Sequence, residues 1–230
     1  MTRDGNPARG RPRAHRTKTS SVVADYILEE IFAGHLKSGD RIDFDQIGQA
    51  LDVSRIPVRE ALLILERDGI VSTRYHRGVY VEPFTAESVL DDFEILGLLS
   101  GIAVRRLAER PDPETIDRLR TLIDELRAAD DGSGEILPLV QEILTVEHRA
   151  GGSRRLRAEL RAFTGFLPAA LGIGARRGRM ATAEAHGQVV AAIVDGDGAK
   201  AAEYRIQDFR AAGQEVVREL ERRGVLTDNE

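Results

Sequence analysis

The spacing of apolar and polar positions predicts a mainly α chain with one short β element. In the first third, apolar stripes at helical spacing predict helices around 20–34, 44–51 and 55–68. Alternating apolar and polar residues over 71–81, interrupted by the polar turn His76-Arg77-Gly78, then predict a β-hairpin. Three helices followed by a hairpin are the elements of a winged helix-turn-helix.

From Thr85 onward the pattern is helical throughout. Breaks rich in Pro and Gly separate predicted helices at 85–109, 113–129, 135–149, 153–171, 182–194 and 199–223. Consecutive helices joined by short turns pack as an antiparallel bundle. The predicted domains are a disordered basic tail (1–18), a winged helix-turn-helix domain (19–83) and an all-helical domain (84–227).

The third predicted helix has the properties of a recognition helix. Ser54 is expected to cap its N-terminus by accepting a backbone N–H bond, and Pro57 is tolerated in the first turn. Arg55 and Arg59 lie four residues apart and project from one side. The opposite side is apolar and comprises Val58, Ala61, Leu62 and Leu65. Such a helix suits a DNA major groove, although a surface helix with two solvated arginines has the same pattern.

Composition narrows the class of protein. The chain has 230 residues, 42% of them hydrophobic and 31% charged, which is typical of a globular protein. The absence of cysteine excludes disulfides, a thiolate nucleophile and a cysteine-based zinc site. No apolar run approaches the roughly 18 residues that a membrane span needs. The N-terminus is basic, but no apolar segment follows it, so we do not interpret it as a secretory signal. We therefore expect a cytoplasmic protein without a membrane partner.

Charge is distributed unevenly along the chain. Residues 1–18 carry six Lys or Arg and one Asp, and since the whole chain sums to −5, the remainder sums to −10. A basic tail on an acidic body suits a protein that contacts DNA at one end, where the tail would add phosphate contacts. A tail with no role is the alternative.

Several ordered segments resemble the winged-helix domain of GntR-family bacterial repressors. The matching stretches are Gly34 with Ser38-Gly39-Asp40, Val53 to Leu62, Leu65 to Val71, and Arg77 to Val81. The helical remainder is similar to the FCD-type ligand-binding domain of the FadR subfamily. That similarity rests on helix number, on the Arg154-Arg155-Leu156 region and on residues 186–209.

The resemblance implies a metabolite-responsive repressor that binds a near-palindromic operator as a homodimer. It implies contacts to double-stranded DNA from the recognition helix and the wing tip, through Ser54, Arg55, Ile56, Pro57 and Arg59 and through Arg77 and Gly78. His76 at the hairpin tip joins them because a wing tip meets backbone phosphate or a minor groove. Asp45 stands where some family members have an arginine, so their operator sequence cannot be transferred.

His186 and Asp208 are the candidate effector residues. Each lies 11 residues from position 197, the centre of a tight turn, so two antiparallel helices bring them to the same level. Both belong to apolar helix faces, and Tyr204 precedes Asp208 by one turn. A buried carboxylate requires a partner or a metal, so a His–Asp pair or a shared divalent ion would satisfy it.

The resemblance also implies a metal, because many FCD domains hold one with an aspartate and three histidines. Here Leu144 stands at the first histidine position, and Asp208 stands at the last. His148, one turn after Leu144, is the substitute. Three interpretations remain: a Zn, Ni or Mn site of His148, His186 and Asp208; a metal-free pocket in which these residues and Tyr204 bind a small carboxylate effector; or a structural polar pair.

Two other function classes share parts of this pattern. A metal-dependent helical-bundle enzyme would use the same two histidines and carboxylate, but the Glu-x-x-His pairs of di-metal bundles are absent from the sequence. An enzyme also has no need of a winged helix. A winged-helix protein-interaction module is the third hypothesis. A DNA-binding regulator, and not an enzyme, is the leading one.

Overall fold

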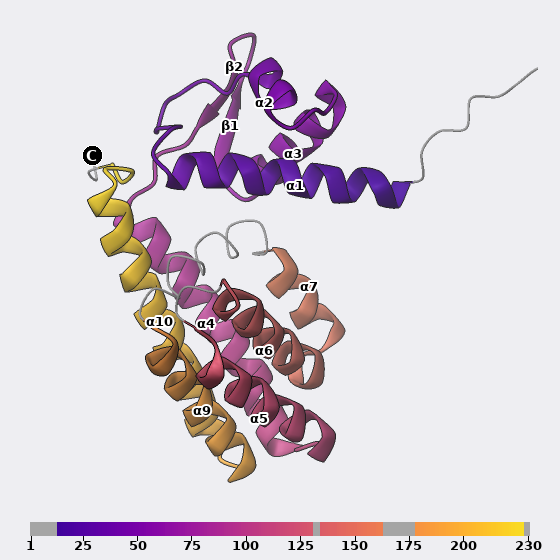
Figure 1. Ribbon diagram of the computed structural model, residues 1–230, viewed down its shortest axis with the longest axis vertical. Coiled ribbons are helices and arrows are strands. Elements are labelled where there is room, and N and C mark those ends of the chain that lie inside the picture. Colours follow the sequence, from indigo (N-terminus) through magenta and orange to yellow (C-terminus); the bar gives the residue numbers. More distant parts are fainter. Residues whose placement is uncertain (1–12, 131–133, 163–177, 228–230) are drawn as a thin grey trace, which may run out of the picture.

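The computed structural model describes residues 13–130, 134–162 and 178–227. A small winged domain lies at one end of a larger bundle of helices (Figure 1). Both parts of the predicted mainly α fold are therefore present. Within the described ranges, no helix is both long enough and apolar enough to cross a membrane.

The winged domain contains three helices and one antiparallel hairpin. They are α1 (Arg13–Phe32), α2 (Phe44–Ala50), α3 (Arg55–Arg67), β1 (Val71–Arg74) and β2 (Gly78–Val81). The hairpin register runs from Val71 opposite Val81 to Arg74 opposite Gly78. Because α1 begins at Arg13, part of the segment predicted as a disordered tail is helical, while residues 1–12 lie outside the described ranges.

The two helices of the helix-turn-helix begin in different ways. Asp43 caps α2 by accepting hydrogen bonds from the backbone N–H groups of Asp45 and Gln46. Ser54 occupies the N-cap position of α3, but its side chain makes no capping hydrogen bond, so that detail of the sequence prediction is wrong. The predicted apolar face of α3 is confirmed, since its four residues are all buried: Val58, Ala61, Leu62 and Leu65.

The bundle follows the predicted order of helices. It comprises α4 (Ala86–Glu109), α5 (Pro113–Ala128), α6 (Ile136–Gly151), α7 (Arg154–Ala162), α9 (Arg179–Val194) and α10 (Gly198–Arg222). Thr85 and Ser88 form a capping box at the start of α4, and Asp112 caps α5. The predicted helical stretch beyond Ala162 lies outside the described residues.

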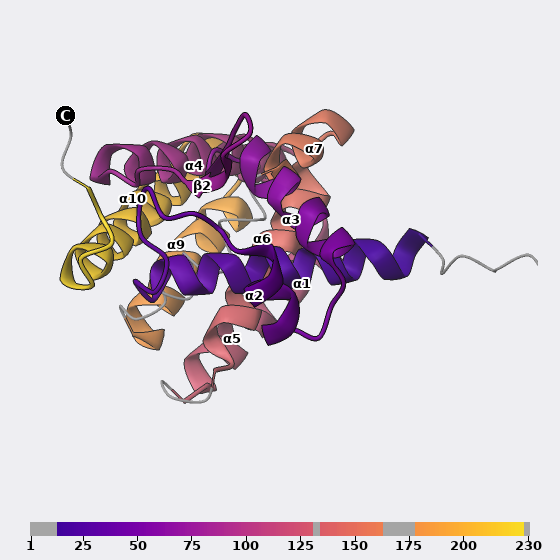
Figure 2. The same ribbon diagram turned by 90° about the horizontal axis from the view of Figure 1, so that it is seen from above.

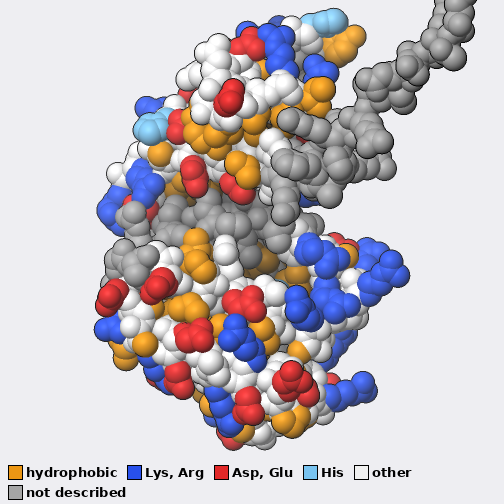
Figure 3. All heavy atoms as spheres, turned by 45° about the vertical axis from the view of Figure 1, so that its right-hand side comes forward, with side chains coloured by type: hydrophobic (Ala, Val, Ile, Leu, Met, Phe, Trp, Pro, Cys, Tyr) orange, Lys and Arg blue, Asp and Glu red, His pale blue; other side chains and the backbone are white. Residues whose placement is uncertain are grey.

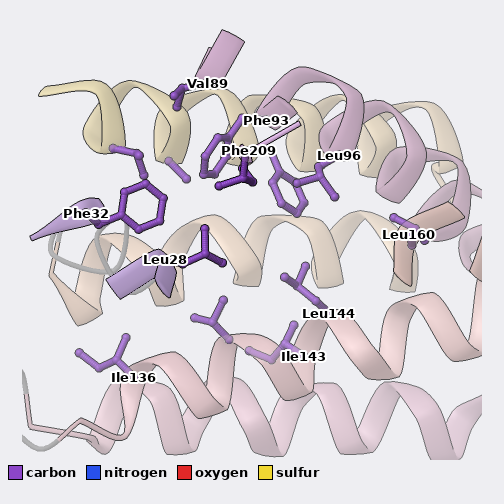
Figure 4. Packing of buried hydrophobic residues seen from close by; sticks show 14 of the residues in the cluster. Leu28, Phe32, Val89, Phe93, Leu96, Ile136, Ile143, Leu144, Leu160 and Phe209 are labelled. Carbon is purple, nitrogen blue, oxygen red and sulfur yellow. The ribbon is translucent and has the colours of Figure 1, made fainter. Parts of the chain in front are cut away.

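Helices α4 and α10 pack closely because glycines face large side chains across their contact. A Cβ added to Gly213 would lie 2.9 Å from Phe93 Cβ, and one added to Gly97 would lie 3.2 Å from Phe209 Cβ. The rings of Phe93 and Phe209 lie next to one another with centroids 6.5 Å apart (Figure 4). Leu28 of α1 belongs to the same apolar cluster, so the core continues into the winged domain.

The C-terminal end of α10 contacts the winged domain. Arg223 Nη1 donates to the carbonyl of Phe32 at 2.9 Å, and the backbone N–H of Thr227 donates to the carbonyl of Phe84 at 2.8 Å. The rings of Phe32 and Phe84 meet edge to face at 6.2 Å. Seen from above, α1 crosses over the bundle helices (Figure 2). The end of α1, the link into α4 and the end of α10 therefore form one junction.

Candidate nucleic-acid interface and effector site

The N-terminal end of α3 presents its predicted DNA-contacting residues to solvent. Ser54, Arg55 and Arg59 are exposed, and Ile56 is 58% exposed even though it is a large apolar residue. Pro57 is half-buried in the first turn. An exposed isoleucine beside two arginines can contact thymine methyl groups while the guanidinium groups reach base edges or phosphates.

Arg55 is paired with a residue of α2. Its Nε donates to Asp45 Oδ1 at 2.6 Å, and its Nη2 donates to Asp45 Oδ2. The hydrogen bonds from Arg55 hold the pKa of the Asp45 carboxyl below its ordinary value. Because this bidentate pair occupies the Nε–Nη2 edge of the guanidinium, Nη1 and the remaining Nη2 hydrogen are left for another acceptor.

The hairpin tip is held by contacts from its own strands. The hydroxyl of Tyr80 donates to the carbonyl of Arg77 at 3.1 Å, and the Arg74 guanidinium lies 4.4 Å from the centroid of the Tyr80 ring. His76 has a φ of +57°, and Gly78 has a φ of +111°. The φ of Gly78 favours glycine because other residues rarely adopt it, and the Arg41 side chain lies close beside this position, with its Nε 2.8 Å from where a Cβ would be.

The structure adds basic residues to the predicted wing. Arg41 and Arg74 are both exposed, and Arg41 also forms a β-bridge with Tyr80. Lys, Arg and His side chains stand among apolar ones at the end of the winged domain farthest from the bundle (Figure 3). Arg41 lies about 35 residues from the hairpin tip in sequence, so only its observed β-bridge with Tyr80 places it beside the wing.

In the bundle, His186 of α9 and Asp208 of α10 face each other as predicted. Both are buried, and His186 Nε2 lies 4.0 Å from Asp208 Oδ2. This confirms the argument that residues equally distant from the turn lie at the same level.

Arg205 connects these two residues to a third. Its Nη1 donates to Asp208 Oδ2 at 2.7 Å and lies 3.0 Å from His186 Nδ1. Its Nη2 donates to Glu147 Oε1 at 2.5 Å. Arg205 and Glu147 are both fully buried. A guanidinium from α10 thus joins side chains of α6, α9 and α10, and we refer to Glu147, His186, Arg205 and Asp208 as the polar cluster.

Burial and charge act against each other in the polar cluster. Burial raises the pKa of Glu147, and the nearby Arg205 charge opposes that rise. Burial lowers the pKa of Arg205, but the carboxylates of Glu147 and Asp208 outweigh it and raise this pKa above its ordinary value. Arg205 therefore remains a cation beside the two carboxylates.

His148 and Tyr204, also predicted as effector residues, make other contacts. His148 Nε2 lies 2.9 Å from Ser100 Oγ on α4, and burial together with the Arg205 charge lowers the pKa of His148 to about 4. Tyr204 is half-buried, and Lys200 Nζ lies 5.7 Å from the centroid of its ring. Neither residue shares a hydrogen bond with His186 or Asp208 in the described part of the chain.

The predicted metal site does not fit the structure. Within the described residues, no group of three or more His, Cys, Asp or Glu side chains is placed to hold a metal ion. A cation, the Arg205 guanidinium, already uses Asp208 Oδ2 and lies at His186 Nδ1, while His148 pairs with Ser100. Residues 163–177 contain no His, Cys, Asp or Glu and so hold none of these metal-ligating side chains.

Sequence reasoning missed Glu147 and Arg205, although a signal was present. Glu147 follows Val140, Ile143 and Leu144 on the buried face of α6, and Arg205 follows Ala201 on the buried face of α10. A charged residue at a core position requires a buried partner of opposite charge. Two such residues of opposite sign on neighbouring faces therefore indicate an internal ion pair.

The fold is that of a DNA-binding regulator: a winged helix with an exposed recognition helix, joined to a helical domain with a buried polar cluster. Comparison with family models gives the same class of protein. Residues 19–81 match "Bacterial regulatory proteins, gntR family", and residues 91–207 match the FCD domain. The chain belongs to the GntR family of bacterial regulatory proteins and carries an FCD domain. Its relatives are transcriptional regulators, so the enzyme hypothesis is wrong.

Individual relatives give the same classification. An "Uncharacterized HTH-type transcriptional regulator" of Mycobacterium tuberculosis is 38% identical over 157 residues, which span 68% of this chain and 64% of the relative. A Paenarthrobacter nicotinovorans protein named "Probable D-xylose utilization operon transcriptional repressor" is 34% identical over 96 residues, or 42% of each chain. The structure of Escherichia coli McbR/YncC superposes with a TM-score of 0.63 at 17% identity, covering 90% of this chain and 97% of that one.

Proposed function

We propose that this regulator is a metabolite-responsive repressor that binds a near-palindromic operator as a homodimer. The observation that carries the proposal is the exposed N-terminal end of α3, where Arg55 is held by Asp45 and Arg59 is free to reach outward. The wing tip, with Arg77 at its end, supplies a second exposed basic contact. Such a protein acts in the cytoplasm, where bacterial operators are found.

In the proposed complex α3 enters the major groove. Arg55, Arg59, Ser54 and Ile56 face base edges or phosphates, and Pro57 shapes the first turn. His76, Arg77 and Gly78 of the wing meet the backbone or the minor groove. Because a two-fold protein dimer presents two copies of this surface, the operator would contain two related half-sites.

Exposed apolar residues of α4 support a dimer. Leu90, Ile95 and Leu98 are 38%, 43% and 49% exposed. Large apolar side chains grouped on one helix favour a contact with another protein surface. A second copy of the chain placed against α4 would cover them and fix the spacing of the two winged domains.

The polar cluster is the proposed effector site. It brings hydrogen-bonding groups from three helices into the core of the bundle, and Glu147 Oε2 and Arg205 Nε have no hydrogen-bond partner among the described residues. These unsatisfied groups would accept hydrogen bonds from, and donate hydrogen bonds to, a small polar metabolite.

Helix α10 gives the effector site a route to the DNA-binding domain. It carries Arg205 and Asp208, and the arginine that follows it, Arg223, binds the carbonyl of Phe32 at the end of α1. An effector that prefers one arrangement of this junction would shift the equilibrium between two orientations of the winged domains. Repression is the proposed direction because the Paenarthrobacter nicotinovorans relative is named a repressor.

Selection of bound sequences from random DNA tests the proposal. We expect the wild type to enrich a short near-palindrome and the double variant Arg55→Ala/Arg59→Ala to enrich none. Arg120→Ala/Arg210→Ala, which removes two exposed bundle arginines, is the matched control and should enrich the same sequence. Enrichment by neither the wild type nor the control would overturn the proposal and favour a winged-helix protein-interaction module.

A further inference from the structure

The buried Arg205 guanidinium lies where the sequence pattern suggested a divalent metal ion. His186 and Asp208, two of the three predicted ligands, both lie within hydrogen-bonding distance of its Nη1, at 3.0 Å and 2.7 Å. Glu147, whose carboxylate could also ligate a metal ion, accepts a hydrogen bond from Arg205 Nη2 at 2.5 Å. We propose that the Arg205 side chain is a built-in cation that replaces a divalent metal in this domain, so that the wild type folds without one.

Charge and donor count support this replacement. Two buried carboxylates and an imidazole are a set of groups that a zinc, nickel or manganese ion would satisfy. A buried carboxylate is strongly destabilising without a counter-charge, and the guanidinium gives each carboxylate one short hydrogen bond. An additional divalent ion would have to displace a cation that is covalently part of α10.

The position of Arg205 on α10 directs its guanidinium at the predicted ligands. It precedes Asp208 by three residues, which is the spacing that places two side chains on the same helix face. It is fully buried, whereas Arg210 of the same helix is 56% exposed and pairs with Glu94. An arginine at the buried position therefore occupies the place that a metal would take, and its removal takes the guanidinium away from Glu147, His186 and Asp208.

Metal binding by the full chain tests the inference and does not depend on DNA binding or on an effector. Wild type, Arg205→Ala, Arg205→Gln and the control Arg210→Ala are stripped with EDTA. They are then unfolded thermally with and without excess Zn²⁺, Ni²⁺ or Mn²⁺, and binding is measured by calorimetry. We expect no stoichiometric binding and no change in Tm for the wild type and Arg210→Ala. At least one of these ions should bind the Arg205 variants and raise their Tm by about 5–10 °C.

The rise should disappear in the double variant Arg205→Ala/Asp208→Ala, since that variant lacks a carboxylate ligand. One equivalent of metal bound by the wild type, and lost on His186→Ala or Asp208→Ala, would overturn the inference. So would Arg205 variants that gain no stability, or recover no fold, in the presence of each metal.

Discussion

Arg55 of the recognition helix donates two hydrogen bonds to Asp45 of the preceding helix, with Nε–Oδ1 at 2.6 Å. This pair fixes one edge of the guanidinium and aims the other away from α2. An arginine held in this way is prepared for bidentate contact with guanine O6 and N7. Asp45 occupies the position where the family resemblance implies an arginine in some members. Here it is thus a positioning residue for Arg55.

Asp45→Ala should weaken sequence discrimination more than total DNA affinity. The variant frees Arg55 to bind phosphate, and it removes a negative charge that repels DNA. We expect the ratio of affinities for selected and scrambled duplexes to fall by about 5- to 100-fold, as loss of one bidentate contact would produce. Asp52→Asn, at a φ of +50° that asparagine tolerates, is the charge control. An unchanged ratio in Asp45→Ala would show that the pair plays no part in recognition.

Arg205→Ala should strongly destabilise the fold when metals are absent. Removing one partner of a buried ion pair leaves the others uncompensated, which lowers the free energy of unfolding by about 3–5 kcal/mol. Arg210→Ala, which breaks a surface pair on the same helix, should lower it by less than about 1 kcal/mol. Urea unfolding followed by far-UV circular dichroism in EDTA measures both. Equal losses would mean that the polar cluster contributes no more than an exposed pair.

Protonation of His148 should make the protein less stable as the pH is lowered. Its pKa is about 4 in the folded protein and near the ordinary 6.5 when unfolded, so between these values the unfolded chain binds a proton that the folded chain does not. The free energy of unfolding should therefore decrease, by up to about 3 kcal/mol, as pH drops from 7 to 4. The Asp92 carboxyl, whose pKa burial raises to about 6, acts in the opposite direction.

Comparison with His148→Gln separates the two effects, because Asp92 is common to both proteins. Urea titration at several pH values gives the unfolding free energy of wild type and variant. Below pH 6.5 the unfolding free energy of the wild type should decrease relative to that of the variant. A difference that does not change with pH would show that His148 is accessible to protons in the folded state.

Arg223→Ala should loosen the junction between the two domains. It removes the 2.9 Å hydrogen bond from a charged donor to the Phe32 carbonyl. Loss of such a bond would raise local opening, and amide hydrogen exchange around residues 30–36 should accelerate about 5- to 30-fold. Peptides from α5 should be unaffected. Arg218→Ala, an exposed arginine paired with Glu215 on the same helix, should leave the junction unchanged; acceleration in both variants would refute a specific role for Arg223.

Local patterns in the sequence predicted most of the fold. The apolar stripe of α3 and the hairpin around His76-Arg77-Gly78 appear as expected, because each depends on residues near one another in the chain. The equal distance of His186 and Asp208 from one turn also predicted their contact correctly. The capping bond of Ser54 did not form, although the residue type and position were right.

Long-range partners were not predictable in the same way. Glu147 and Arg205 are 58 residues apart, and only the packing of α6 against α10 through the core reveals their ion pair. Sequence reasoning considered His, Asp and Glu as metal ligands and did not consider arginine. In the structure Arg205 supplies the positive charge at this site. The sequence grouped His148 with His186 and Asp208, but its contact is Ser100 of α4, 48 residues away, which no local pattern shows.

A binding titration of the selected duplex tests the central claim most directly. Fluorescence anisotropy at about 150 mM salt compares wild type and Arg59→Ala on the selected duplex and on a permuted duplex of equal composition. The wild type should bind the selected duplex at least about 1,000-fold more tightly than the permuted one. Arg59→Ala should lose at least about tenfold of that preference, with its Tm unchanged because Arg59 is exposed. Equal affinity of the wild type for both duplexes would contradict a sequence-specific regulator acting through α3.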